Sequence, residues 1–228
     1  MPTRRKPEPA PPPRPYHHGS LPEALLAAAE TVLLRDGIAG LGLRSIAREA
    51  GVSHTAPKHH FGDTTGLLSA LAAVGFQRLG EAMRDVLVEG ADAVARRHAI
   101  ARAYVHFAND NAALFGLMFR NEKIDMQNPA LAKATGDAMR SMAAVIGGKA
   151  RIPEGLPPTL QDAEALQVTA AWGYVHGLAI LLIDQRLRGL LKLTPGFGDP
   201  VKLVDAVLAQ MRLGLGPKSP SKKAKKKG

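Results

Sequence analysis

The chain is 228 residues long, with 46% hydrophobic residues, 22% charged residues and no cysteine. This composition is typical of a globular protein and argues against an intrinsically disordered chain. The lack of cysteine excludes a disulfide scaffold, a thiolate metal site and a cysteine nucleophile, and it favours a cytoplasmic protein. The net charge of +10 lies mostly in the two ends of the chain, so it is weak evidence for a nucleic-acid partner.

Both ends are basic and of low complexity. Residues 1–18 carry four basic residues among many prolines, and residues 217–228 carry six lysines. We expect a disordered proline-rich arm and a disordered lysine-rich tail. The arm has no apolar stretch after its basic residues, unlike a secretory signal. The longest apolar run, residues 168–183, is shorter than the roughly 20 residues that span a bilayer, so we expect no membrane span.

Three helices are predicted between residues 20 and 61. A capping box at Ser20 opens the first helix, and Gly37 follows its end. Residues 43–50 form a short second helix that ends at Gly51. Ser53 is predicted to cap the third helix, which runs to residue 61.

The rest of the body also shows helical spacing and no strand-like alternation, so the fold class is all-α. Two loops are expected, at residues 152–158 and 189–198, because both are rich in proline or glycine. The predicted helices cover residues 63–88, 93–108, 112–119 and 159–188, and two more begin at Asn128 and Asp199.

Residues 43–53 have the pattern of a helix-turn-helix. The first short helix buries Ile46 and Ala47, Gly51 supplies the turn, and the second helix begins at a sharp angle. Its outward face would carry hydroxyl, imidazole and ammonium groups that can bind base edges and phosphates in a major groove. On the pattern alone, a plain helical hairpin is an equally good interpretation.

Residues 20–80 resemble the DNA-binding domain of TetR-type transcriptional regulators. The resemblance rests on residues 43–53, His60-Phe61, Asp63 and Leu67-Leu68. One subgroup of the family is indicated by residues 16–21, 52–61 and 107–119, together with a Trp-x-x-x-His-Gly signature at residues 172–177. The resemblance covers the whole body of the chain.

The resemblance implies a homodimeric regulator, a repressor, that binds a palindromic operator and is released by a small-molecule effector. It implies an N-terminal helix-turn-helix domain at residues 19–80 and an effector-binding and dimerisation domain at residues 81–216. The DNA-binding residues are then expected to be Arg44, Ser45, Ser53, His54, Thr55, Ala56, Lys58, His59 and His60.

Two positions depart from the family pattern. Lys58 stands where the family usually has a tyrosine that contacts phosphate, and a lysine can still do so as a point charge. Gly42 stands where the family usually has a hydroxylated cap, which removes one plausible backbone contact to DNA. We therefore expect the basic side chains to carry more of the affinity.

Aromatic and methionine side chains of the central helices suit an adaptable apolar pocket, and they equally suit an ordinary core. The effector is expected to be apolar or aromatic. The predicted pocket residues are Tyr104, Phe107, Phe115, Met118, Phe119, Met139, Met142, Trp172 and His176. For Trp172 and His176, packing in the core is favoured over direct contact with a ligand.

A two-fold interface is expected between the last two long helices of each subunit. Small residues there allow close crossing, and apolar stripes provide buried area. The predicted interface residues are Gly173, Gly177, Ile180, Leu203, Val207 and Met211.

No catalytic or metal-binding pattern stands out. Adjacent histidines point in different directions on a helix and lack acidic partners at ligand spacing, so we expect no metal, no cofactor and no enzyme activity. Two alternatives remain at this stage: a helical ligand-binding protein or enzyme with a vestigial helix-turn-helix, and an architectural protein that binds polyanions through its ends.

Overall fold

The computed structural model describes residues 20–147, 162–194 and 196–211. The predicted arm, the lysine-rich tail and the predicted loop at residues 152–158 lie outside the described residues. Every regular element in the described part of the chain is a helix, so the prediction of an all-α fold is confirmed.

The N-terminal helices differ from the prediction in one respect. The first is α1 (Leu21–Asp36), followed by a 3₁₀ turn (Ile38–Gly40) and α2 (Leu43–Ala50). The next helix, α3, spans only Ala56–Phe61, so the predicted cap at Ser53 is wrong. The Ser53 and Thr55 hydroxyls lie 3.1 Å apart in the turn, where they bind each other instead of the first amides of α3.

The remaining helices mostly begin where capping residues predict. The side chains of Asp63, Asp92, Asn128 and Asp199 each accept a hydrogen bond from a backbone N–H in the first turn of the helix that follows. These helices are α4 (Thr64–Asp85), α5 (Ala93–Asp110), α6 (Ala112–Met118), α7 (Pro129–Ile146), α8 (Asp162–Ile183), α9 (Arg188–Leu193) and α10 (Pro200–Gln210).

The helix predicted for residues 159–188 is wrong at its C-terminal end. α8 stops at Ile183, and α9 forms within the predicted loop of residues 189–198. Gln185 takes the left-handed conformation with φ 58°, and the Arg186 N–H donates to the Leu181 carbonyl at 2.9 Å, which closes the helix. Glycine or asparagine usually occupies such a position, so the sequence carries no stop signal there.

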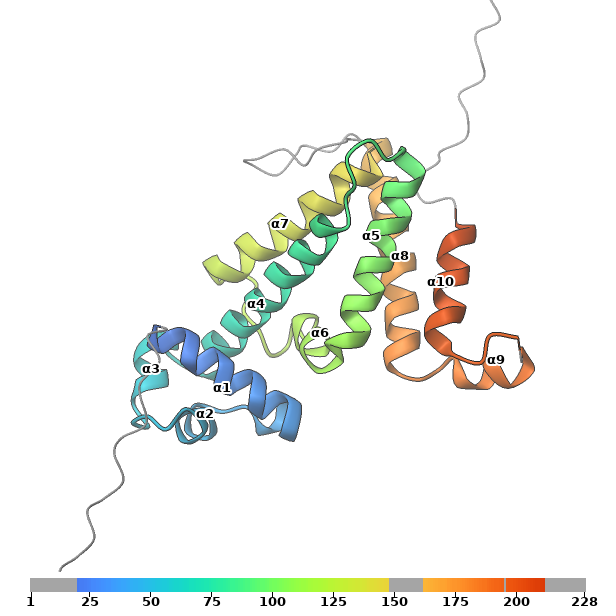
Figure 1. Cartoon of the computed structure of the whole chain (residues 1–228). Coiled ribbons are helices and arrows are strands. Elements are labelled where there is room, and N and C mark those ends of the chain that lie inside the picture. Colours follow the sequence, from blue (N-terminus) through green and yellow to red (C-terminus); the bar gives the residue numbers. More distant parts are fainter. Residues whose placement is uncertain (1–19, 148–161, 195, 212–228) are drawn as a thin grey trace, which may run out of the picture.

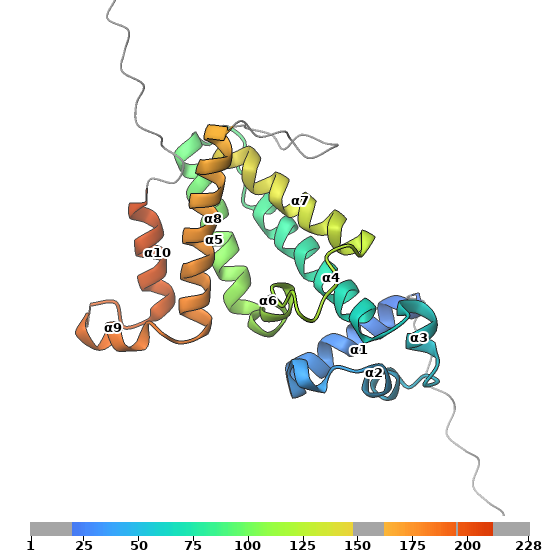
Figure 2. The same cartoon turned by 180° about the vertical axis from the view of Figure 1, so that it is seen from behind.

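Figure 1 shows α1, α2 and α3 at one end of the molecule and α9 and α10 at the other. α4 leaves the three-helix end and runs beside α7, and α5 lies beside α8 in both views (Figures 1 and 2). α6 contacts α1, α4 and α5. The domain boundary expected at residue 80 therefore falls within α4, which packs on elements of both parts.

α8 is the most apolar long helix. It has 22 residues, and an 18-residue stretch of it has a mean hydropathy of 1.5, so by length and composition alone it could cross a membrane. One face of α8 packs against α5, α7 and α10, with Val168, Val175 and Leu182 in the core. Its high hydropathy reflects that buried face together with a second apolar face, described below.

Candidate functional site

The turn between α2 and α3 is built by a glycine in the left-handed conformation. Gly51 has φ 68°, and its N–H donates to the Arg48 carbonyl at 3.2 Å. The next N–H, of Val52, donates to the Ala47 carbonyl at 3.0 Å. This pair of bonds closes α2 and redirects the chain within two residues, so α3 begins close to the end of α2.

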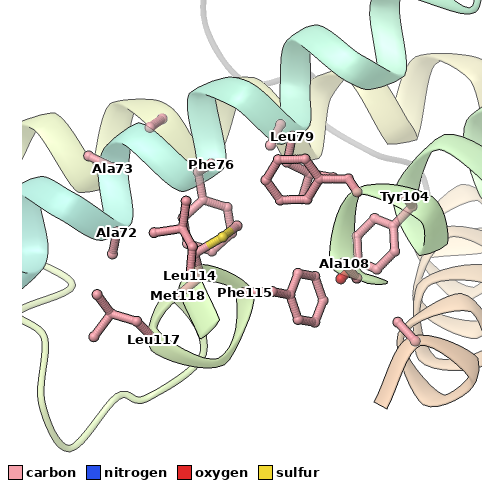
Figure 3. Close-up of a cluster of buried hydrophobic side chains, with 14 of the residues drawn as sticks. Ala72, Ala73, Phe76, Leu79, Tyr104, Ala108, Leu114, Phe115, Leu117 and Met118 are labelled. Atoms are coloured by element: carbon pink, nitrogen blue, oxygen red, sulfur yellow. The ribbon is translucent and has the colours of Figure 1, made fainter. Parts of the chain in front are cut away.

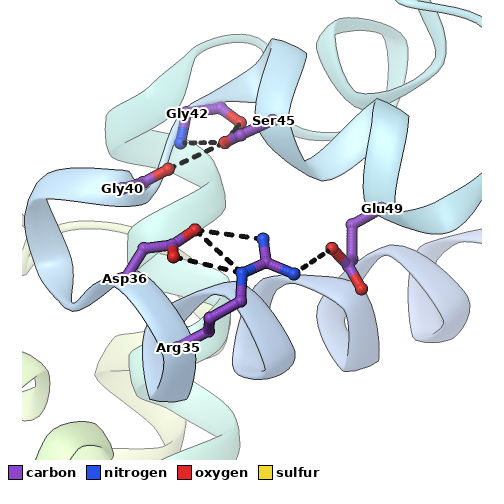
Figure 4. Close-up of polar contacts among 6 residues, drawn as sticks. All are labelled: Arg35, Asp36, Gly40, Gly42, Ser45 and Glu49. Carbon is purple, nitrogen blue, oxygen red and sulfur yellow. Dashed lines mark hydrogen bonds and ion pairs between the residues drawn. The ribbon is translucent and has the colours of Figure 1, made fainter.

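Ser45 provides the cap that Gly42 lacks (Figure 4). Its hydroxyl accepts the Gly42 N–H at 3.1 Å and lies 2.8 Å from the carbonyl oxygens of both Gly40 and Gly42, to either of which it can donate. The sequence does not reveal this arrangement, because the hydroxyl acts from the third position of the helix. Ser45, a predicted DNA contact, is half-buried with its hydroxyl directed at this loop.

Arg35 joins α1 to α2 (Figure 4). Its guanidinium donates to Glu49 at 2.8 Å and to the neighbouring Asp36 at 3.0–3.2 Å. The hydrogen bond from Arg35 holds the pKa of the Asp36 carboxyl below its ordinary value. The bridge also neutralises two carboxylates beside α2 that would otherwise repel a polyanion.

The outward surface of α2, the turn and α3 is polar and basic. Arg44, Ser53, His54, Thr55, Lys58, His59 and His60 are exposed, and Ala56 is half-buried. Arg44 and Lys58 make no ion pair within the described part of the chain. Arg48 is also exposed there and was not among the predicted contacts. We call this surface the basic face.

A close contact fixes α3 against the start of α4. A Cβ atom at Gly66 would lie 2.1 Å from the Phe61 carbonyl oxygen, a distance that no side chain can accept. On the same turn, Asp63 accepts the Gly66 N–H at 2.8 Å. Glycine at this position therefore sets the angle at which the basic face meets the long helix α4.

A cavity of about 250 Å³ lies among α4, α5, α6, α7 and α8. Figure 3 shows part of its wall, with Phe76 and Leu79 of α4 near Met118 of α6. The lining residues are Phe76, Leu79, Met83, Tyr104, Met118, Phe119, Asn121, Met126, Thr135, Ala138, Met139, Met142 and Trp172.

Six of the nine predicted pocket residues line this cavity: Tyr104, Met118, Phe119, Met139, Met142 and Trp172. Phe107, Phe115 and His176 do not line it. Phe115 is fully buried behind the wall, 5.7 Å from the Tyr104 ring and 5.5 Å from the His176 ring between centroids. The prediction missed the α4 residues and the α6–α7 loop, because their spacing is that of an ordinary core helix and of a polar connection.

Tyr104 is the centre of a buried polar network. The Trp172 indole N–H donates to the Tyr104 hydroxyl at 3.3 Å, and that hydroxyl lies 2.9 Å from His176 Nδ1. The Tyr104 hydroxyl can accept from the indole and donate to Nδ1 of a neutral His176 whose proton is on Nε2. Burial raises the pKa of Tyr104 and lowers that of His176, so both stay uncharged near neutral pH.

The mouth of the cavity is formed by exposed side chains. Asn121, Met126 and Met139 are all exposed, with Met126 and Met139 at 41% and 37%. The loop that carries Asn121 and Met126 is held to α4 by the buried Ser69, whose hydroxyl accepts the Asp125 N–H at 2.8 Å. The position of one side of the mouth therefore depends on α4.

The second face of α8 is apolar and exposed. It carries Leu166, Tyr174, Ile180 and Leu181, which are 37–73% exposed. Gly173 and Gly177 lie on this helix with nothing within 4 Å of an added Cβ. Of the other predicted interface residues, Leu203 is buried within the subunit, while Val207 and Met211 are half-buried.

Comparison with protein families decides the class of protein. Residues 25–71 match the model of bacterial regulatory proteins of the tetR family, and residues 97–211 match that of the tetracyclin repressor-like C-terminal domain. The chain belongs to the TetR family. It is a TetR-family transcriptional regulator, and its helix-turn-helix lies within the residues that match the tetR-family model.

Solved structures of similar proteins share this fold. A protein with unknown function from Rhodococcus sp. RHA1 is 36% identical, with a TM-score of 0.65 over 85% of this chain and 94% of that one. A tetR-family regulatory protein from Rhodococcus RHA1 is 18% identical (TM-score 0.59; 87% and 100% covered). The TetR regulator PfmR from Thermus thermophilus is 17% identical (TM-score 0.51; 81% and 94% covered). No curated protein matches the chain at a significant level.

Proposed function

We propose that this TetR-family regulator is a repressor that binds a palindromic operator as a homodimer and is released when a small molecule fills the cavity. It would belong to the subgroup with the Trp-x-x-x-His-Gly signature, found here at residues 172–177. The observation that carries the proposal is the basic face, where exposed cations surround a helix-turn-helix whose neighbouring carboxylates are already paired.

The expected DNA contacts come from α2, the turn and α3. Lys58 and His59 lie on α3, the recognition helix, which would enter the major groove. Arg44 and Arg48 lie on α2, the helix that crosses the phosphate backbone when this motif binds DNA. Ser45 would contribute by holding the start of α2 through its hydroxyl rather than by contacting DNA directly. Ser53, His54 and Thr55 would meet DNA from the turn.

Dimerisation is supported by the second face of α8. An exposed apolar surface on a long helix is unfavourable in water, and two copies that cross at Gly173 and Gly177 would cover it. A dimer also presents two recognition helices to two half-sites, which one short helix needs for selectivity.

Release by an effector is supported by the cavity. Its wall includes Phe76 and Leu79 on α4, the same helix that Gly66 fixes against α3. A ligand that prefers one arrangement of α4 would change the population of the DNA-competent dimer.

The test is fluorescence anisotropy of the full chain with the DNA upstream of its own coding sequence and with a shuffled control, at near-physiological salt. We expect selective binding. The double variant Lys58→Ala, His59→Ala should weaken it by at least about 100-fold, because each contact contributes about 1–3 kcal/mol in both subunits.

The matched control is Lys123→Ala, which removes an exposed lysine from the α6–α7 loop, outside the basic face. Its affinity should equal that of the unmodified chain. If the double variant binds as well as this control, α3 does not read the operator and the proposal fails.

A further inference from the structure

The cavity is lined by uncharged side chains. Ten of its lining residues are aliphatic, aromatic hydrocarbon, thioether or indole groups, and the other three are Tyr104, Asn121 and Thr135. Since the pKa of Tyr104 is raised by burial, the phenol stays neutral. A charged group placed inside would lose its water without gaining an ionic partner from these residues, which is costly.

The hydroxyls of the polar lining residues Tyr104 and Thr135 already have partners within the protein. The Tyr104 hydroxyl is bonded to Trp172 and His176. The Thr135 hydroxyl lies 2.9 and 3.0 Å from the Leu131 and Ala132 carbonyl oxygens of its own helix. With Tyr104 donating to Nδ1 of His176, Thr135 donating to its own helix and the Trp172 N–H bonded to Tyr104, these residues offer a ligand no unused side-chain donor, and their two hydroxyls can only accept a hydrogen bond from it.

Asn121 differs from these groups. It is exposed at the mouth, and its amide makes no hydrogen bond to any residue that the structure describes. It can donate and accept. Among the described lining residues, Asn121 therefore supplies the unused side-chain N–H that a ligand filling the cavity can reach at the entrance.

The volume of the cavity sets the size of a ligand, and its lining residues set the range of ligand shapes that it can accept. A cavity of 150 Å³ holds one benzene molecule, so about 250 Å³ holds a larger apolar body. Five of the chain's seven methionines line this space: Met83, Met118, Met126, Met139 and Met142. Their flexible thioethers can adapt to ligands of different shape.

We propose that the cavity binds an uncharged, mostly apolar molecule of roughly ten non-hydrogen atoms, with a hydrogen-bond acceptor that binds the Asn121 amide N–H. This inference rests on the proposed function, in which the cavity is the effector site. It assigns the effector's charge and its orientation. The apolar body of the ligand would contact Tyr104 and Trp172, and its polar end would lie at the mouth of the cavity.

The test compares three probes with the same alkyl chain: octan-1-ol, octanoate and octylammonium. The flexible chain follows the shape of the cavity, and none of the three fluoresces, so Trp172, the chain's single tryptophan, reports binding from the cavity wall. Titrations of the full chain at pH 7.5 should show saturable binding of the alcohol, at least about tenfold tighter than of either ion. Equal or tighter binding of either ion, or no saturable binding of the alcohol, would overturn the proposal.

Orientation is tested with two variants of the same exposed loop. Asn121→Ala should weaken octan-1-ol binding about 2- to 10-fold, the usual effect of one neutral hydrogen bond. Gln127→Ala, outside the cavity lining, should leave it unchanged. Unchanged binding in Asn121→Ala, or an equal loss in both variants, would refute the placement of the polar group.

These titrations contain no DNA, so their result is independent of the operator experiment. If the alcohol binds as expected but leaves operator affinity unchanged, the effector role in the proposed function fails and the assignment of the ligand class stands. If an ion binds best and releases the operator, the ligand class fails and the proposed function stands.

Discussion

The basic face and the cavity use polar side chains in opposite ways. At the basic face, Ser45 and Arg35 bind backbone and carboxylate groups beside α2 and leave cations exposed to solvent. At the cavity, the hydroxyl of Tyr104 is bonded away from the open space, which leaves a neutral apolar wall. In both regions a few hydrogen bonds and ion pairs fix the local structure. The groups that those contacts do not use, cations at the basic face and apolar side chains at the cavity, are the ones available to a partner.

The largest loss of stability is expected where α3 of the basic face meets α4, which forms part of the cavity wall. Gly66→Ala would place a Cβ 2.1 Å from a backbone oxygen, so the start of α4 must move away from α3. We expect a loss of about 3 kcal/mol or more in the free energy of unfolding, measured by urea denaturation.

The matched control is Gly116→Ala, on α6, where an added Cβ meets nothing within 4 Å. Alanine favours a helix over glycine there by up to about 1 kcal/mol, so this variant should be as stable as the unmodified chain or more so. Similar stabilities for the two variants would show that α3 and α4 are not held by this contact.

An intermediate effect is expected from Tyr104→Phe. The substitution keeps the ring and removes the hydroxyl, which leaves the Trp172 N–H and His176 Nδ1 without their partner. We expect a loss of about 1–3 kcal/mol in the free energy of unfolding and a change in Trp172 emission. Loss of stability without a spectral change would mean that the network does not include the indole.

The smallest expected effect is a pH dependence of the stability, which arises from His176 in the hydrogen-bond network beside the cavity. Burial lowers the pKa of His176, so the unfolded chain takes up its proton at a higher pH than the folded chain does. The stability that His176 contributes is complete above its ordinary pKa of about 6.5 and is lost as the pH falls through the lowered value. Unfolding temperatures at pH 7.5 and 5.5 measure this loss.

The comparison variant is His176→Asn, whose amide oxygen can still accept the Tyr104 proton but does not titrate. Its stability should fall less than that of the unmodified chain between the two pH values, since the other histidines are common to both. An identical fall would place the titrating group elsewhere.

Most of the helices could be predicted, because their starts depend on local chemistry. Asp63, Asp92, Asn128 and Asp199 each cap the helix that follows, and a cap involves only residues within one turn. The end of α8 could not be predicted, because Gln185 adopts a left-handed conformation that its side chain does not favour.

The candidate sites were predictable to different degrees. Gly51 marks the turn of the helix-turn-helix directly, since a left-handed position favours glycine. The cavity depends on which side chains meet across five helices, and sequence spacing cannot separate Met118, which lines it, from Phe115, which packs behind it. Ser45 was expected to contact DNA from the family resemblance, which does not show the direction of its hydroxyl.

The hydrogen bond from Asp125 to Ser69 has a consequence for loop exchange between relatives. The loop after α6 supplies Asn121 and Met126 to the mouth, and its backbone is fastened to α4 at one buried hydroxyl. Grafting this loop from another regulator to alter ligand preference therefore requires that the donor segment present an N–H at position 125. The exposed side chains of the loop can then be varied, whereas the buried Ile124 beside that N–H and the length of the graft cannot.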